Sequence, residues 1–242
     1  MVSKSQIKLV RQLGQKKLRD KHQLFVAEGL KVIREFIDEN YQLHKLYALD
    51  QRHFPFQNVS VVNQTQMKAM SDLKTPSDAL AVFAIPKFQT SSQPDLVLAL
   101  ESIQDPGNLG TIIRLCDWFG IQDIICSSDT VDCYNPKVVR STMGSLARVQ
   151  VFYKDLQSWL MGLKDYKIVA TSMTGQSIYE HSFDTPTILM IGNEGRGLSK
   201  QLTELSNNNL SIPRFGGAES LNAAMATSII LAEARRNTST EK

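Results

Sequence analysis

Two glycine-rich turns in the C-terminal part of the chain carry residues suited to binding a ligand. The first, residues 192–197, follows the apolar segment 187–191, and the second, residues 216–222, follows residues 210–213. Glycines allow a backbone to approach a ligand closely and to adopt positive φ. If both apolar segments are strands of one α/β sheet, their turns form a ligand crevice at its edge. The turns also supply polar side chains at Glu194, Ser220 and Asn222.

The first turn does not match the common nucleotide-binding loops. Gly192 and Gly197 have the spacing at which a phosphate-binding P-loop begins, but Leu198-Ser199 stand where that loop has Lys-Ser or Lys-Thr, so the lysine that would hold phosphates is missing. The GxGxxG pattern of dinucleotide-binding folds is also missing as a strand-to-helix turn. The turns therefore serve either a different ligand or ordinary strand-to-helix geometry.

A third polar turn follows the apolar segment 95–100. Residues 105–107 are typical turn residues, and Asn108 is placed to cap the helix that follows. Arg114 lies within that helix, close in sequence to the end of the strand. This position fits two interpretations, a solvated helix residue and a cation beside the crevice.

The elements that must position these residues alternate between strand and helix. This alternation predicts a parallel sheet with helices on both faces. We expect strands at residues 95–100, 123–126, 149–152, 167–171, 187–191 and 210–212, and helices at residues 109–119, 136–146, 156–163, 200–205 and 221–236.

The N-terminal part of the chain reads as a smaller α/β unit. We expect helices at residues 3–18, after Gly29 and at residues 65–70, and strands at residues 25–27, 45–49, 59–62 and 79–85. A polar linker, residues 87–94, ends at a proline. We therefore place one domain at residues 1–90 and a second at residues 95–242. The polar residues 237–242 are expected to be disordered.

Composition sets the broad class of protein. The chain of 242 residues is 42% hydrophobic and 21% charged, as in ordinary globular proteins. It shows no apolar run of membrane-spanning length and no signal peptide, so we expect a cytoplasmic protein without a membrane partner. The first 21 residues carry seven basic side chains and one acidic side chain. This bias fits either a polyanion-binding region or a solvated basic helix.

The cysteines and histidines do not predict a metal site. Three cysteines, Cys116, Cys126 and Cys133, form no CxxC pair, and the four histidines are scattered along the chain. We therefore expect neither a disulfide framework nor bound metal, and a reducing compartment.

The three turns and their flanking segments resemble the three motifs of the SpoU (TrmH-type) RNA 2′-O-ribose methyltransferases of the SPOUT superfamily. The matching segments, in the family's order and at compatible spacing, are IQDPGNLGTIIRLCDWFGI, IGNEGRGLS and LSIPRFGGAESLNAAMA. Three ordered motifs are a far more specific signal than one glycine-rich loop.

The resemblance implies that the parallel sheet belongs to a SPOUT domain with a deep trefoil knot, whose loops bind S-adenosylmethionine largely through backbone groups. The implied cofactor-binding residues are Thr171, Gly192, Asn193, Gly195, Ile212 and Leu221. The implied catalytic residues are Asn108, Arg114, Glu194, Ser220 and Asn222. They would align a ribose 2′-hydroxyl with the sulfonium methyl group. A guanidinium stays protonated in proteins, so a phosphate clamp suits Arg114 better than a literal base role.

The N-terminal segments QLFVAEGLKVIREFI and MSDLKTPSDALAVFAIP resemble the L30e-like substrate-binding domain found ahead of many SpoU enzymes. This resemblance implies a structured RNA substrate, more often ribosomal than transfer RNA, and a homodimer. Arg140, in the family-like segment VVRSTMGSLARV, is either an RNA contact or a plain surface residue. The apolar face of the last helix would pack against a second subunit or serve as ordinary core.

Two other functions compete with this prediction. One is a non-catalytic RNA-binding or ribosome-assembly protein on the same fold, against which the complete set of motif residues argues. The other is a SPOUT enzyme that methylates a base, although the asparagine–arginine and Ser-Leu-Asn motifs resemble the ribose-modifying group.

Overall fold

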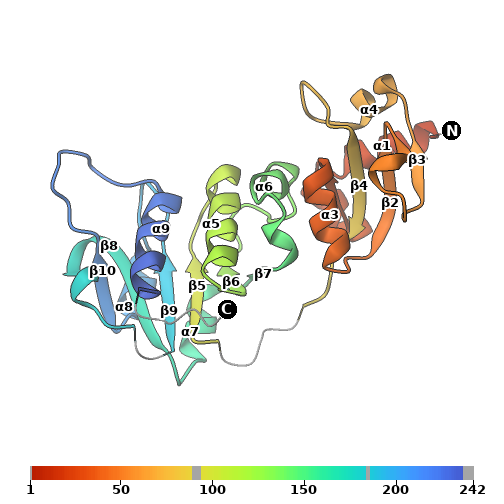
Figure 1. The fold of residues 1–242 in the computed structure, drawn as a ribbon. Coiled ribbons are helices and arrows are strands. Elements are labelled where there is room, and N and C mark those ends of the chain that lie inside the picture. Colours follow the sequence, from red (N-terminus) through yellow and green to blue (C-terminus); the bar gives the residue numbers. More distant parts are fainter. Residues whose placement is uncertain (1, 89–93, 184–185, 237–242) are drawn as a thin grey trace. The chain divides into compact units, whose positions relative to one another are not determined.

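A computed structural model describes residues 2–88, 94–183 and 186–236 (Figure 1). The chain forms two compact units: Met1–Phe88 with Asp132–Arg148, and Gln89–Val131 with Val149–Lys242. Most of the expected linker, and the expected disordered tail at residues 237–242, lie outside the described residues. The two-domain division at residues 90 and 95 stays a prediction, and residues 132–148 pack with the first unit instead of the second.

The first unit contains a mixed four-stranded sheet in the order β1-β4-β2-β3. Strand β4 runs antiparallel to both β1 and β2, whereas β2 and β3 are parallel. Its elements are α1 (Lys4–Gln12), α2 (Lys16–His22), β1 (Leu24–Glu28), α3 (Leu30–Asp38), β2 (Leu43–Ala48), β3 (Val59–Val61), α4 (Gln64–Met70) and β4 (Ala79–Ala84).

The single helix expected at residues 3–18 is wrong, because the structure contains two helices there. Ser3 caps α1 in a reciprocal capping box with Gln6, and the helix ends at Gln12. Gly14 then follows the C-cap residue Leu13, and α2 begins at Lys16. Glycine disfavours a helix interior, and here it lies where the chain breaks between the two helices.

Residues 132–148 complete the first unit. Arg19 is 1% exposed and forms an ion pair with Asp132, and its Nη1 donates to the carbonyl oxygens of Leu13 (2.8 Å) and Gly14 (3.0 Å). The ring of Tyr134 lies 4.7 Å from that of Phe25. A buried charge needs such a complete set of partners, so this segment is a structural part of the unit.

The helix expected at residues 136–146 is shorter in the structure. Helix α6 (Pro136–Ser141) ends before Gly144, which has a φ of 105°. A Cβ at Gly144 would lie 2.4 Å from Cγ of Glu35, so a side chain there would collide with α3. A separate 3₁₀ turn, Ser145–Ala147, follows.

The second unit is built on an all-parallel six-stranded sheet in the order β10-β8-β9-β5-β6-β7, as the alternating pattern predicted. Its strands are β5 (Leu96–Leu100), β6 (Asp123–Cys126), β7 (Gln150–Tyr153), β8 (Lys167–Ser177), β9 (Thr187–Ile191) and β10 (Asn208–Ser211). Strand β8 runs past the expected end at residue 171, because its polar second half pairs with β10.

Helices cover both faces of this sheet (Figure 1). On one face, α7 (Leu156–Met161) and α8 (Lys200–Glu204) pack through Leu156, Leu160 and Leu202 against Val97 and Ala99 of β5. Helices α5 (Pro106–Trp118) and α9 (Ala223–Ala234) pack against each other on the other face. The helices cover the two faces of the sheet, and the loops that follow the strands lie at its carboxyl edge.

The described part of the chain contains no helix that is both long and apolar enough to cross a bilayer. All three cysteines are buried, and burial raises the pKa of the Cys116 thiol.

Candidate active site

The predicted glycine-rich turn lies at the carboxyl end of β9, a central strand of the parallel sheet. Strand β9 pairs with β5 on one side and with β8 on the other. The backbone N–H of Glu101, just after β5, donates to the carbonyl of Ile191 at 2.9 Å. Thr171 donates its hydroxyl to the carbonyl of Met190 at 2.8 Å. The ends of β5 and β9 are thus tied together, with Thr171 of the longer strand β8 beside them, at the edge where ligands bind in open α/β sheets.

The turn itself is closed on its own backbone. Asn193 and Gly197 pair across it, with N···O distances of 3.2 and 2.8 Å. A Cβ at Gly192 would lie 2.3 Å from the carbonyl carbon of Gly197 and 2.4 Å from the nitrogen of Leu198. Gly197 has a φ of 68°. Glycine is required at position 192 because a side chain has no space there, and it is favoured at position 197 because of the positive φ.

Asn193 holds this turn from inside. Its side-chain Oδ1 accepts from the backbone N–H groups of Gly195 (3.0 Å) and Arg196 (3.2 Å), and its Nδ2 donates to the carbonyl of Ser102 at 2.9 Å. One side chain therefore couples the turn after β9 to the turn after β5.

Behind Ser102 lies a polar cluster that the sequence analysis missed. Ser102 has a φ of 57°, and its hydroxyl donates to Asp129. The hydroxyl of Ser127 donates to the other carboxylate oxygen of Asp129 at 2.6 Å and accepts from the backbone N–H of Ser102 at 2.8 Å. These hydroxyl groups, Ser102 first, hold the pKa of Asp129 below its usual range. The run of serine, aspartate and threonine directly after β6 was the available signal.

Asp129 thus supports the Ser102 carbonyl that anchors Asn193. We expect Asp129→Asn to weaken S-adenosylmethionine binding about tenfold, because one stabilising charge-assisted hydrogen bond is lost. Isothermal titration checks this, with exposed Ser128→Ala as the neighbouring control. Since the folded-state pKa lies below the ordinary 3.8, the carboxylate's support is present above pH 3.8 and is lost as acid protonates it. Unchanged affinity of the Asp129 variant would contradict the assignment.

Three of the predicted catalytic residues form one hydrogen-bonded chain. Asn222 Nδ2 donates to Asn108 Oδ1 at 2.9 Å, and Asn108 Nδ2 donates to Glu194 Oε1. Asn222 Oδ1 also caps α9 by accepting from Ala224 (3.0 Å) and Met225 (3.3 Å). The three sequence motifs therefore meet at one place, and each contributes one member of the chain.

The capping role expected for Asn108 is wrong. Asp105 caps α5, accepting from the Asn108 backbone N–H at 2.9 Å, and Pro106 occupies the first turn. Asn108 is therefore already inside the helix, which leaves its side chain available for Glu194 and Asn222. Proline at the start of a helix was the signal for the earlier cap.

Arg114 lies apart from the hydrogen-bonded group of Asn222, Asn108 and Glu194. It is exposed on α5, and within the described residues its guanidinium makes no hydrogen bond or ion pair. Six residues along a helix amount to about 9 Å of rise and a rotation of about 120° from Asn108. Trp118, one turn further on the same face, is 83% exposed.

The second predicted turn is the long loop between β10 and α9 (Figure 1). Ile212 is half-buried, whereas Ser220 and Leu221 are exposed. Among the described residues, these three make no hydrogen bond to the turn after β9. Their binding and catalytic roles, with those of Thr171, Gly192, Asn193 and Gly195, stay predictions.

Two family models match the chain. Residues 95–232 match the SpoU rRNA Methylase family, and residues 4–81 match the MRM3-like substrate binding domain. The first match contains every predicted catalytic residue, and the second contains most of the sheet of the first unit.

Similar proteins extend over nearly the whole chain. The 23S rRNA (guanosine(2553)-2′-O)-methyltransferase RlmP of Bacillus subtilis is 29% identical over 91% of this chain and 92% of its own length. The 23S rRNA (uridine(2479)-2′-O)-methyltransferase of Streptomyces viridochromogenes is 29% identical over 93% and 86%, respectively. The AdoMet-bound rRNA methyltransferase from Sinorhizobium meliloti superimposes with a TM-score of 0.88 at 30% identity, covering 99% of this chain and 98% of that one.

Proposed function

The chain belongs to the SpoU rRNA methylase family, and we propose that it transfers a methyl group from S-adenosylmethionine to a ribose 2′-hydroxyl of large-subunit ribosomal RNA. The observation that carries this proposal is the Asn222–Asn108–Glu194 chain, which joins all three motifs at the carboxyl edge of the sheet. Two similar proteins, each covering more than nine-tenths of this chain, are named for 23S rRNA ribose methylation. Family membership also implies the trefoil knot.

The turn after β9 fits a cofactor held by backbone groups. Gly192 leaves no space for a side chain, and Asn193 fixes the turn from within. Thr171 and Gly195 lie at the same edge, and Ile212 and Leu221 would supply apolar contact for the adenine. When bound, S-adenosylmethionine supplies the electrophilic methyl group.

The hydrogen-bonded residues would align the acceptor, and the Glu194 carboxylate would accept the proton of the 2′-hydroxyl as its oxygen bonds to the methyl group and the methyl–sulfur bond breaks. Glu194 accepts from Asn108, which fixes the orientation of that amide and, through it, of Asn222. The exposed hydroxyl of Ser220 is available to the ribose or its phosphate. Arg114 would hold an RNA phosphate with its planar guanidinium and so place the 2′-hydroxyl in line with the methyl group.

A homodimer forms part of this proposal. Arg114 and Trp118 share one exposed face of α5, turned away from the direction of Asn108. An exposed tryptophan is typical of a protein–protein contact. Buried Ala223, Ala224 and Ile230 make one side of α9 core, whereas Met225 is 58% exposed. A second copy docked on this face would bring its Arg114 to the active site of the first copy. We place the protein in the cytoplasm, where ribosomes are made.

The direct test is methylation of 23S rRNA transcribed in vitro by the purified protein. We expect S-adenosylmethionine-dependent formation of a 2′-O-methylnucleoside, identified by mass spectrometry of the digested RNA, with a transfer RNA transcript as the control. A methylated base would instead assign the protein to base chemistry. Failure to bind S-adenosylmethionine in isothermal titration would favour a non-catalytic RNA-binding protein.

A further inference from the structure

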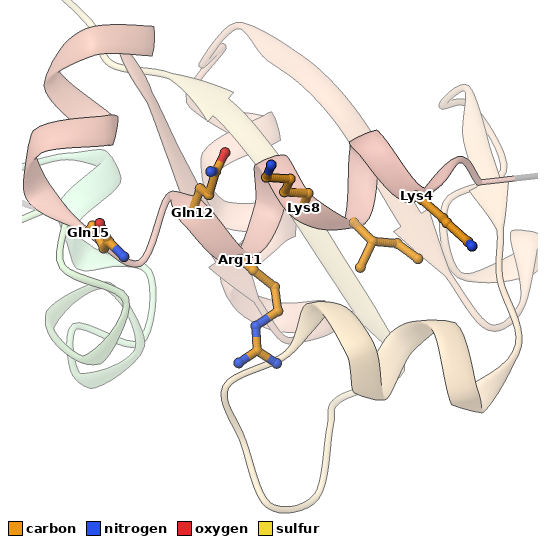
Figure 2. A pocket seen from close by; sticks show the side chains of 6 residues that line it. Lys4, Lys8, Arg11, Gln12 and Gln15 are labelled. Carbon is orange, nitrogen blue, oxygen red and sulfur yellow. The ribbon is translucent and has the colours of Figure 1, made fainter.

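An open groove of about 470 Å³ runs along the outer face of α1 in the first unit (Figure 2). In Figure 2, the basic and amide side chains follow one another along the helix and into the turn before α2. The groove is lined by Lys4, Ile7, Lys8, Arg11, Gln12 and Gln15.

The charged residues of the groove have helical spacing. Lys4, Lys8 and Arg11 are separated by four and three residues, which places them on one face of α1. Four residues correspond to about 6 Å of rise along the axis, so the cations form a row and not a single cluster. A row of cations suits an extended polyanion better than one small anion.

The cations of this row are not used in holding the fold together. Within the described part of the chain, none of Lys4, Lys8 and Arg11 makes an ion pair, in contrast to Arg19, which is paired with Asp132. The first turn of α1 contains no acidic residue, and Lys4 stands there. A lysine in the first turn opposes the helix dipole, so helix stability does not explain its presence.

The apolar side of the same helix is already occupied. Val10 is 3% exposed and Leu13 is fully buried, both in the core beside Met67 and Met70 of α4, with Ile7 packed against them. This side is therefore closed to a membrane, into which a basic amphipathic helix would have to insert its apolar face. The outer face of the helix remains for a polar, anionic partner.

We infer that the groove on α1 binds the sugar–phosphate backbone of the RNA substrate. Lys4 and Lys8 contact phosphates as point charges, and Arg11 can donate two parallel N–H groups to two oxygens of one phosphate. Gln12 and Gln15 offer donors and acceptors to ribose hydroxyl groups. The inference rests on the proposed RNA substrate, and it assigns a specific contact surface on the first unit to that substrate.

The test is filter binding of the full-length protein to 23S rRNA transcribed in vitro, over salt concentrations from about 50 to 200 mM. We compare wild type with the triple variant Lys4→Gln/Lys8→Gln/Arg11→Gln, which preserves helix propensity. Because each lost phosphate contact reduces the slope of log K against log salt by about one, we expect a decrease of about two to three. Affinity at the lower salt falls at least about tenfold, and the KM for RNA rises while kcat is kept.

A matched control removes the same charge elsewhere. Lys31, Lys87 and Lys164 are exposed on separate parts of the chain and, among the described residues, make no ion pair. The triple Lys31→Gln/Lys87→Gln/Lys164→Gln keeps the wild-type salt slope to within one unit if the groove is specific. A second variant, Lys4→Arg/Lys8→Arg/Arg11→Lys, retains the charges and restores binding.

Three results would overturn the inference. The first is a wild-type affinity and salt slope in the groove variant, and the second is an equal loss in the control. The third is a groove-dependent attachment to vesicles of anionic phospholipid with RNA binding unaffected. A wild-type protein that binds RNA through the groove but never methylates it would refute the proposed function and leave the groove assignment standing.

Discussion

Replacing Arg114 by alanine lowers the methylation rate about 1,000-fold and leaves S-adenosylmethionine binding unchanged, if this guanidinium positions the RNA for transfer. Arg114 is exposed and, within the described residues, bonded to no other side chain, so its removal leaves no buried group unsatisfied. Single-turnover methylation and isothermal titration measure the two quantities. Arg114→Lys keeps the charge but loses the planar fork, and we expect an intermediate rate.

Arg236→Ala is a suitable control, because it removes another exposed arginine from the second unit and lies at the far end of α9. It is expected to retain the wild-type rate. A wild-type rate in the Arg114 variant would remove this residue from the mechanism, and loss of cofactor binding would show that it acts on the fold.

Subunit mixing tests whether Arg114 serves its own chain or a partner. We expect Arg114→Ala and Glu194→Gln proteins, each inactive alone, to regain activity when they are mixed and allowed to exchange subunits. In the proposed homodimer, random pairing would make half of the dimers mixed, each with one intact site, so the rate would reach about a quarter of wild type. No recovery in subunits shown to have exchanged would place both residues in the same chain's site.

Replacing Gly192 by alanine abolishes cofactor binding and destabilises the second unit. The new Cβ would lie 2.3 to 2.5 Å from backbone atoms of Gly197 and Leu198, which cannot move aside as a flexible side chain can. Overpacking of this kind costs about 3 kcal/mol, which corresponds to a decrease in Tm of about 6–12 °C. We expect at least a 100-fold loss in affinity for S-adenosylmethionine, because the turn must open to make room for the alanine side chain.

Gly216→Ala is the matched glycine variant. A Cβ there meets nothing within 4 Å, and Gly216 lies in the loop before α9, outside the turn that closes on itself. It is expected to keep the wild-type Tm, measured by circular dichroism. A wild-type Tm and a wild-type affinity in the Gly192 variant would mean that the closed turn is not what the cofactor requires.

Local patterns in the sequence predicted the parallel sheet well. Strand 187–191 was predicted with its observed bounds, because it is short, apolar and bounded by turn residues. The extension of β8 to Ser177 was not predictable, since its polar residues are held by pairing with β10 and not by burial. Two wrong predictions had local signals against them. Gly14 indicated a break in the helix expected at residues 3–18, and Pro106 indicated that the next helix begins before Asn108.

The predicted site was partly recognisable for the same reason. Asn108, Glu194 and Asn222 lie in motifs, and the structure joins them. Asp129 lies in no motif and acts only through Ser102 and then Asn193, so its contribution depends on contacts between distant parts of the chain. The packing of residues 132–148 with the first unit is likewise a long-range property that periodicity does not encode.

The placement of residues 132–148 changes what a truncated protein would contain. The polypeptide passes between the two units three times, so one cut after residue 88 leaves the N-terminal fragment bound to the remainder through Asp132 and Tyr134. A fragment that stops at residue 90 would leave the guanidinium of Arg19 without its carboxylate and expose the ring of Phe25. Isolating the small unit therefore requires grafting the later segment onto it.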